Sequence, residues 1–150
     1  MSHTYTSNRM HVIFSTKERQ KRLREEIQPK LWAYMAGIAH NHKFEAIKVG
    51  GAEDHCHALV LLPAPMPLSK AVQTLKGCSS KWLNDTGAAG AGFAWQEGYG
   101  AFSVSASQTD TVVEYIKNQP AHHKKRDYEE EFLELLRRYG INYDAAHVLG

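Results

Sequence analysis

Two histidines separated by one residue, His55 and His57, have the spacing that best suits metal chemistry. The apolar run 58–62 follows them and ends at Pro63, a pattern that predicts a buried β-strand. Side chains alternate along a strand, so the two imidazoles face one side, about 6.5 Å apart, while Cys56 faces the other. Two imidazoles at this spacing can bind one cation, so the pattern predicts half of a metal site.

A second reactive group lies further along the chain, between Thr109 and Pro120. Its apolar residues recur at helical spacing, and Pro120 makes continuation of this helix past Gln119 unfavourable. Tyr115 and Gln119 are four residues apart, which places a phenol above an amide on one helix face. If that face points towards the histidine pair, the amide can coordinate the metal and the phenol can act as a nucleophile.

Another histidine and the two cysteines are weaker candidates for functional residues. His11, on a strand predicted over 10–16, could join the metal site, although a single strand histidine is more often a packed or surface residue. Cys56 and Cys78 are too few for a disulfide framework, so we expect reduced thiols and a cytoplasmic protein.

The His-x-His strand followed by a Tyr-x-x-x-Gln helix resembles the HUH single-tyrosine transposases of the smallest bacterial insertion sequences and their REP-associated relatives. The resemblance extends over nearly the whole chain, through the segments 12–17 (VIFSTK), 75–80 (LKGCSS), 95–99 (WQEGY) and 118–126 (NQPAHHKKR). Cys56 departs from the family pattern, in which a bulkier aliphatic residue is more usual at this position.

The resemblance implies a DNA transposase that cleaves and rejoins single-stranded DNA at hairpin-flanked ends. Tyr115 would form a 5′-phosphotyrosine, while His55, His57 and Gln119 would bind Mg²⁺ or Mn²⁺. It also implies a homodimer, in which the tyrosine helix of one copy can serve the histidine pair of the other. A phosphotyrosine preserves the energy of the cleaved bond, so no nucleotide hydrolysis is needed. The glycine-rich stretch 86–92 accordingly lacks the features of a P-loop.

The charge distribution also suits an anionic partner. The net charge is only +2, but the first 24 residues carry six Arg and Lys residues against one acidic residue. The competing interpretation is a solvated surface loop. We expect contacts to nucleic acid from basic residues in three parts of the chain: Arg19, Lys21, Arg22, Lys76, Lys81, Lys124, Lys125 and Arg126.

The order of predicted elements indicates an α+β fold. Strands are expected at 10–16, 44–49, 55–62 and 102–105, with helices at 25–40 and from Ser69 onward between them. This order matches a ferredoxin-like βαββαβ antiparallel sheet with helices on one face, and helices 109–119 and 127–139 are appended. Residues 1–150 are expected to form a single catalytic domain, and the absence of an eighteen-residue apolar run predicts no membrane association.

Two other functions remain open from the sequence. A non-catalytic single-stranded nucleic-acid-binding module could keep the same sheet, although the RNA-binding signature of such sheets is absent from this sequence. A metal-dependent phosphodiesterase could use water as the nucleophile and leave Tyr115 without a role. A tyrosine nucleophile must lose its proton during attack, and no residue in the sequence identifies the base that accepts it.

Overall fold

The computed structural model describes residues 3–150 and shows a four-stranded antiparallel sheet. Its strands are β1 (Asn8–Ser15), β2 (Glu45–Gly51), β3 (His55–Leu62) and β4 (Gly100–Val104). They lie in the order β2-β3-β1-β4, and each neighbouring pair is antiparallel. Helix α1 (Gln28–Asn41) joins β1 to β2, and helix α2 (Leu68–Thr86) joins β3 to β4. This is the predicted ferredoxin-like βαββαβ arrangement.

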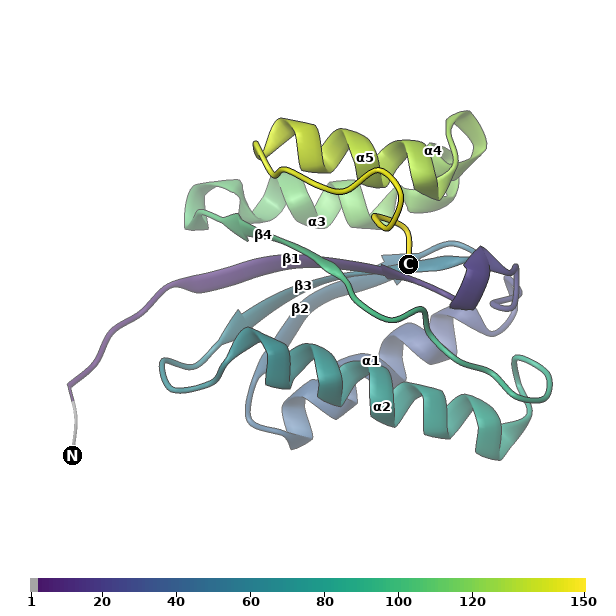
Figure 1. Cartoon of the computed structure of the whole chain (residues 1–150). Coiled ribbons are helices and arrows are strands. Elements are labelled where there is room, and N and C mark those ends of the chain that lie inside the picture. Colours follow the sequence, from purple (N-terminus) through teal and green to yellow (C-terminus); the bar gives the residue numbers. More distant parts are fainter. Residues whose placement is uncertain (1–2) are drawn as a thin grey trace.

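Helices cover both faces of this sheet (Figure 1). Helices α1 and α2 lie against one face, as the βαββαβ pattern requires. The appended helices α3 (Thr109–Lys117), α4 (Gln119–Lys125) and α5 (Tyr128–Arg138) lie on the opposite face. None of the helices in the described part of the chain combines the length and the hydropathy needed to cross a bilayer.

Strand β3 is buried on both sides because helices cover both faces of the sheet. Cys56 packs with Ala58 and Val60 in the core cluster beneath α1 and α2. His55 and His57 alternate with them and face the appended helices, as strand periodicity predicts. Burial raises the pKa of the Cys56 thiol well above its usual range, so Cys56 is an inert core residue.

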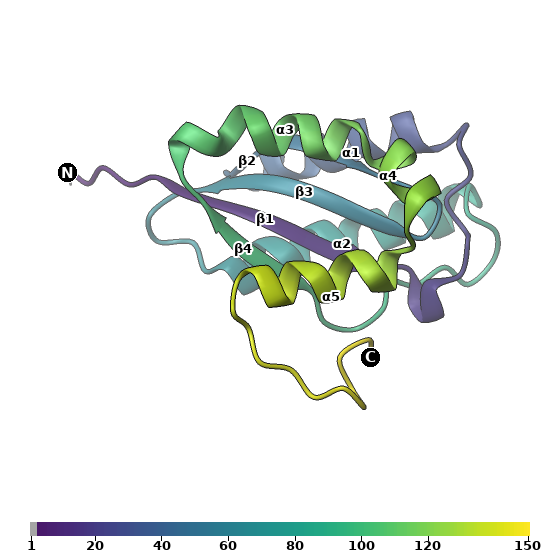
Figure 2. The same cartoon turned by 90° about the horizontal axis from the view of Figure 1, so that it is seen from above.

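Helices α3 and α5 cover different halves of the upper face of the sheet. Ile116 of α3 packs with Leu59 of β3, whereas Phe132 of α5 packs with Ile13 and Phe102. Figure 2 shows the result from above: α3 and α5 run along opposite sides, with the central strands β1 and β3 between them. Side chains that rise from β1 and β3 therefore lie between these two helices.

The predicted helix through Gln119 is interrupted. Helix α3 ends at Lys117, Asn118 joins the two helices, and Gln119 and Pro120 begin α4. The sequence predicted one helix that carries both Tyr115 and Gln119 and does not continue past Gln119, and both parts of this prediction were wrong. Proline lacks a backbone N–H and is tolerated in a first helical turn, so the chain restarts a helix there.

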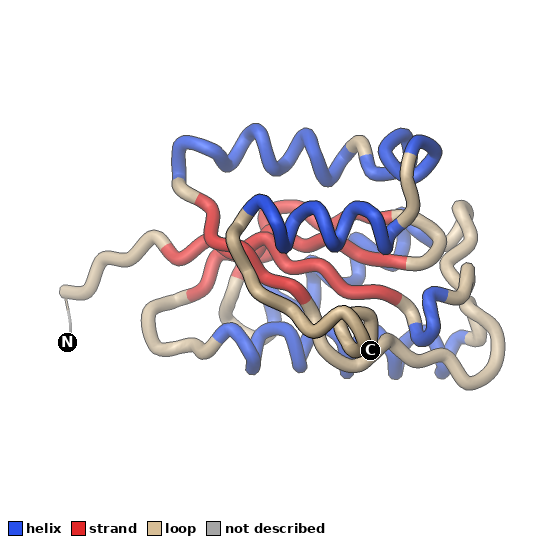
Figure 3. Tube along the Cα trace, turned by 45° about the horizontal axis from the view of Figure 1, so that its top comes forward, coloured by secondary structure: helices blue, strands red, loops and turns tan. Residues whose placement is uncertain are grey.

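The chain after α5 has no helix or strand and folds back along the molecule (Figure 3). Asp127 caps the start of helix α5, and its carboxylate accepts a hydrogen bond from the Glu130 backbone N–H at 2.9 Å. Beyond it, Leu149 packs beside the Phe132 cluster, and its carbonyl accepts a hydrogen bond from Arg19 at 3.0 Å. The C-terminal segment thereby connects α5 to the basic stretch near the start of the chain.

Gly50 of β2 permits the close approach of α3. A β-carbon at this position would lie 2.9 Å from both the Cγ2 atom and the backbone oxygen of Ile116. We expect Gly50→Ala to lower the free energy of unfolding by about 1–3 kcal/mol, measured by urea denaturation, because α3 must shift. Gly37→Ala is the control, since its β-carbon would meet no atom within 4 Å and it should stabilise α1 slightly. Equal stability of the two variants would contradict this packing.

Candidate active site

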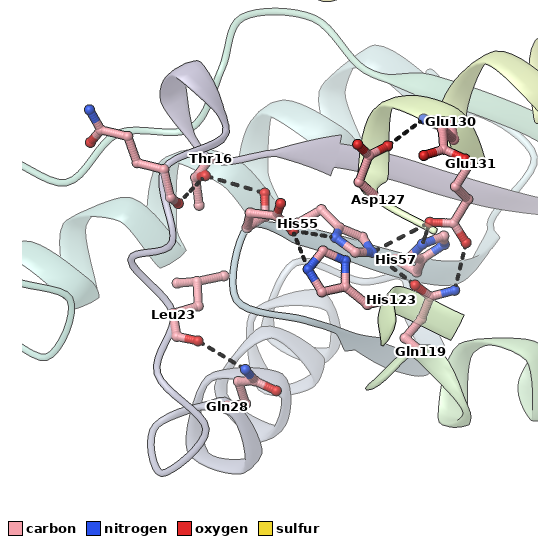
Figure 4. Close-up of polar contacts among 12 residues, drawn as sticks. Thr16, Leu23, Gln28, His55, His57, Gln119, His123, Asp127, Glu130 and Glu131 are labelled. Carbon is pink, nitrogen blue, oxygen red and sulfur yellow. Dashed lines mark hydrogen bonds and ion pairs between the residues drawn. The ribbon is translucent and has the colours of Figure 1, made fainter. Parts of the chain in front are cut away.

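His55 and His57 open β3 side by side on the face covered by α3 and α5. Both side chains are fully buried, and their ring centroids are 5.1 Å apart. The Nε2 atoms of His57 and His55 lie 3.2 Å and 3.5 Å from the same oxygen, Oε1 of Glu131. The two rings therefore present the same nitrogen to one point between the helices (Figure 4).

The other nitrogen of each ring is held by a neighbouring side chain. Nδ1 of His55 lies 2.8 Å from the Asp54 carboxylate, and Nδ1 of His57 lies 2.7 Å from Nε2 of His11. Such outer contacts fix the tautomer and orientation of a metal-binding imidazole. His11, which we considered as a further ligand, therefore contacts His57 from the side away from Glu131.

Glu131 of α5 is the residue that connects the site, and sequence reasoning missed it. Its Oε1 atom faces the two histidines, while its Oε2 atom accepts a hydrogen bond from the Gln119 amide at 2.9 Å. The Tyr115 hydroxyl also donates a hydrogen bond to Oε2. One buried carboxylate thus contacts the predicted nucleophile and all three predicted metal ligands.

Tyr115 and Gln119 reach this carboxylate from α3 and α4. The Tyr115 ring stacks on His122 with centroids 4.8 Å apart and lies edge-on to His57 at 5.8 Å. Gln119 is fully buried, and its Oε1 atom lies 2.8 Å from Nε2 of His55. The break at Asn118 therefore leaves both side chains beside the histidine pair.

The donor atoms fit a divalent cation. His55, His57 and Glu131 each offer one ligand atom, and these atoms lie within 4.8 Å of one another. His55 has oxygen acceptors beside both ring nitrogens, from Asp54 at Nδ1 and from Gln119 at Nε2. A cation at Nε2 would be held by this ring nitrogen and by the Gln119 amide oxygen together. Imidazole nitrogens combined with amide and carboxylate oxygens are an ordinary ligand set for a divalent metal.

The electrostatics of the site keep Glu131 ionised and Tyr115 protonated. Burial favours the neutral form of Glu131, but His57 and Tyr115 outweigh it and hold the pKa of Glu131 below its usual range. Burial and the Glu131 carboxylate raise the pKa of Tyr115 well above its usual value, and the nearby charge of Arg126 opposes this rise. A proton acceptor therefore already contacts the phenol.

Acid should destabilise the metal-free protein through His11. Burial, followed by the charge of His57, lowers the pKa of His11 from 6.5 to about 3. Below about pH 6.5 the unfolded chain binds a proton that the folded chain does not. The free energy of unfolding in chelator should therefore fall by about 2 kcal/mol from pH 7 to pH 5, with His57 acting in the same direction. Urea titrations at each pH would measure this change, and the His11→Asn variant should lose part of the pH dependence. A free energy of unfolding that rises on acidification would contradict the prediction.

The structure separates the basic residues that were predicted to contact DNA. Arg126 lies beside Tyr115, and Lys124 and Lys125 are exposed on the adjacent helix α4. Lys76 and Lys81 belong to α2, on the opposite face of the sheet (Figure 1).

Several of these basic side chains also have partners within the chain. Arg22 donates hydrogen bonds to the carbonyls of Ala89 and Ala91, both at 2.7 Å. Lys76 donates to two loop carbonyls, and Lys81 pairs with an aspartate on its own helix. Arg19 donates to Leu149, and Lys21 is exposed. The roles of these basic residues in binding DNA stay predictions, and Arg126 is the one that lies beside Tyr115.

The sequence does contain a pattern that marks Glu131 as a candidate site residue. Tyr128, Glu131 and Leu135 are spaced by three and four residues, so the carboxylate lies within the buried stripe of α5. A charged residue on the apolar stripe of an amphipathic helix is rare unless it is paired. What the sequence does not reveal is that the partner of Glu131 comes from β3 and α3.

The fold is similar to those of a candidate transposase and a tyrosine transposase. A candidate transposase from Deinococcus radiodurans R1 superposes with a TM-score of 0.61 and 24% sequence identity, covering 79% of this chain and 96% of that one. A REP-associated tyrosine transposase bound to a REP hairpin superposes with a TM-score of 0.59 and 13% identity, covering 82% of this chain and 73% of that one. At these identities the similarity establishes the fold alone.

The family is established by sequence. The family model described as "Transposase IS200 like" matches residues 4–119, from the segment before β1 to Gln119. The chain therefore belongs to the IS200-like transposase family, as its motifs predicted. No curated protein matches it. The family match ends before α5, so Glu131 lies outside it.

Proposed function

We propose that this chain cleaves and rejoins single-stranded DNA at hairpin-flanked ends through a 5′-phosphotyrosine, with the help of a divalent metal. The observation that carries the proposal is the position of the Tyr115 hydroxyl. It donates a hydrogen bond to Glu131, whose other oxygen faces His55 and His57. The proposed nucleophile, a carboxylate that can accept its proton and the proposed cation site therefore lie next to one another within one chain.

The cleavage step follows from these contacts. The Tyr115 hydroxyl oxygen attacks the phosphorus, and its proton passes to Oε2 of Glu131. The bond from phosphorus to the 3′ oxygen breaks, and that oxygen takes a proton from water to become a free 3′ hydroxyl. Glu131 returns its proton to the hydroxide that this leaves, so the carboxylate is regenerated and the protons balance. Attack by a 3′ hydroxyl on the phosphotyrosine reverses the step, so rejoining needs no nucleotide cofactor.

His55, His57, Gln119 and Glu131 are the residues that would hold Mg²⁺ or Mn²⁺. When bound, such an ion supplies Lewis-acid polarisation of a non-bridging phosphate oxygen. The chain contributes the orientation of the ligands, since Asp54 and His11 hold the two imidazoles.

Arg126 is well placed to act on the same phosphate. It lies beside Tyr115 and forms an ion pair with Glu134. Its guanidinium can neutralise a phosphate oxygen, because planar bidentate contacts suit phosphate. Lys124 and Lys125 would then meet neighbouring phosphates along the strand.

We further propose that residues 1–150 act as one catalytic domain that binds DNA hairpins as a homodimer. Support for hairpin binding comes from the REP-associated neighbour, which is bound to a REP hairpin. Because Tyr115 contacts Glu131 within one chain, each subunit carries a complete set of the site residues. A second copy would then hold the other DNA end.

The test is a denaturing gel of the protein incubated with single-stranded hairpin DNA from the flanks of its own gene. The DNA carries its label at either the 3′ or the 5′ end, and Mn²⁺ or chelator is added. We expect a protein–DNA adduct that forms only with Mn²⁺ and retains only the 3′ label. DNA binding without any adduct would instead favour the non-catalytic binding module.

A further inference from the structure

A cavity of about 450 Å³ opens beside the phenol ring of Tyr115. Its walls come from β1, β4, α3, the C-terminal end of α5 and the loop between β4 and α3. Its lining includes Gln108, Thr111, Val112, Tyr115, Leu135 and Tyr139. None of the described residues that form its wall is acidic, so an anionic strand meets no carboxylate there.

The lining combines surfaces that suit a flat, polar-edged ring. Val112 and Leu135 supply apolar area, and Tyr139 is 44% exposed. Tyr139 is held by stacking on Phe102, with centroids 4.7 Å apart, so it offers a fixed aromatic surface. Ligand pockets in proteins are typically apolar hollows of this volume with a few polar groups that set orientation.

Two polar side chains that line the cavity can form hydrogen bonds to a ligand. Gln108 and Thr111 are exposed, and in the described structure neither side chain makes a hydrogen bond to the protein. A glutamine amide presents a donor and an acceptor together, the pattern that pairs with the edge of a nucleobase. Arg138, at the end of α5, also lines the wall, and its guanidinium pairs with Glu134 at 3.2 Å.

We propose that this cavity, defined by Gln108, Thr111, Val112, Leu135 and Tyr139, is a subsite for one unpaired nucleobase next to the cleaved phosphate. The inference rests on the proposed function, because it assumes that Tyr115 meets a DNA phosphate. Because Tyr115 lines this cavity, a strand whose phosphate lies at the Tyr115 hydroxyl can place a neighbouring nucleotide in it. The base then stacks against the apolar and aromatic wall, and Gln108 reads its edge.

The subsite gives a direct prediction for DNA that lacks one base. The probe is the oligonucleotide that forms the adduct, with an abasic analogue placed in turn at each nucleotide flanking the cleaved bond. For the wild-type chain, one position should weaken binding by about 5- to 150-fold, the loss expected for one base stacked on aromatic residues. Binding is measured with metal replaced by chelator, so that cleavage does not interfere.

A cavity-filling variant tests whether that base occupies this cavity. Thr111→Trp places an indole in the opening from an exposed position of α3, and its folding is checked by thermal denaturation. It should bind intact and abasic DNA equally well, because the subsite is blocked for both. Glu114→Trp is the control on the same helix, since Glu114 is exposed and does not line the cavity, and it should keep the wild-type ratio.

The outcomes separate the subsite from the proposed function. If the wild-type chain binds and cleaves the DNA but no abasic position changes binding beyond twofold, the subsite is refuted and the transposase chemistry stands. If Thr111→Trp retains the full abasic penalty, the base lies elsewhere and the assignment of this cavity is wrong. If the wild-type chain neither binds nor cleaves any flanking DNA, the proposed function fails first and the subsite fails with it.

Discussion

Tyr115→Phe should abolish the protein–DNA adduct and strand cleavage while leaving DNA affinity within about twofold of the wild type. The substitution removes one oxygen, the atom that would attack phosphorus, and leaves the ring stacked on His122. Because the hydroxyl contacts Glu131 and the phosphate contacts are expected from other, basic residues, DNA binding should persist. Adduct formation on denaturing gels and affinity by fluorescence anisotropy measure the two effects separately.

Tyr34→Phe is the matched control for this experiment. Tyr34 lies on α1, on the opposite face of the sheet, and stacks on Trp82 with centroids 4.8 Å apart. Its variant should form the adduct at the wild-type rate. Cleavage that survives in Tyr115→Phe would point to water as the nucleophile, the phosphodiesterase mechanism that the sequence left open.

Glu131→Gln should slow adduct formation by about 10²- to 10⁴-fold, the usual contribution of a positioned general base. The substitution keeps the shape of the side chain but removes the charge that accepts the Tyr115 proton and faces both histidines. We expect weaker Mn²⁺ binding by calorimetry as well. The defect in adduct formation should remain at saturating Mn²⁺, because metal alone does not replace the proton acceptor.

Glu130→Gln controls for charge on the same helix, since Glu130 is exposed and precedes Glu131 directly. It should react at the wild-type rate. If Glu131→Gln recovers full activity once Mn²⁺ is saturating, Glu131 acts only as a ligand and the proton goes elsewhere. Wild-type activity of Glu131→Gln at all metal concentrations would remove Glu131 from the mechanism altogether.

Local periodicity was enough to predict the sheet and one half of the site. Alternation along β3 predicted that His55 and His57 share a face and that Cys56 faces the other way, and the structure confirms both. The order of strands and helices predicted the ferredoxin-like topology, because that arrangement follows from which elements are adjacent in the chain. These features depend on short-range patterns that a single sequence carries.

The rest of the site depends on how distant elements pack, which periodicity does not encode. The stripe of apolar residues on α5 predicts a buried face but not the strands that it contacts, so Glu131 looked like one acid in an acidic segment. The restart of a helix at Gln119 was likewise missed, since Pro120 ends one helix and is equally compatible with the first turn of another. His11 was recognised as a candidate, but its contact with Nδ1 of His57 became visible only in three dimensions.

The most direct measurement is to map the adduct by mass spectrometry after nuclease and trypsin digestion. Trypsin cuts after lysine and arginine, so Tyr99 and Tyr115 fall in one fragment, residues 82–117, and its fragmentation spectrum distinguishes them. We predict a nucleotide attached through its 5′ phosphate to Tyr115 alone. Attachment to Tyr99 or to any other residue, or a linkage through a 3′ phosphate, would contradict the assignment of Tyr115 as the nucleophile held by Glu131.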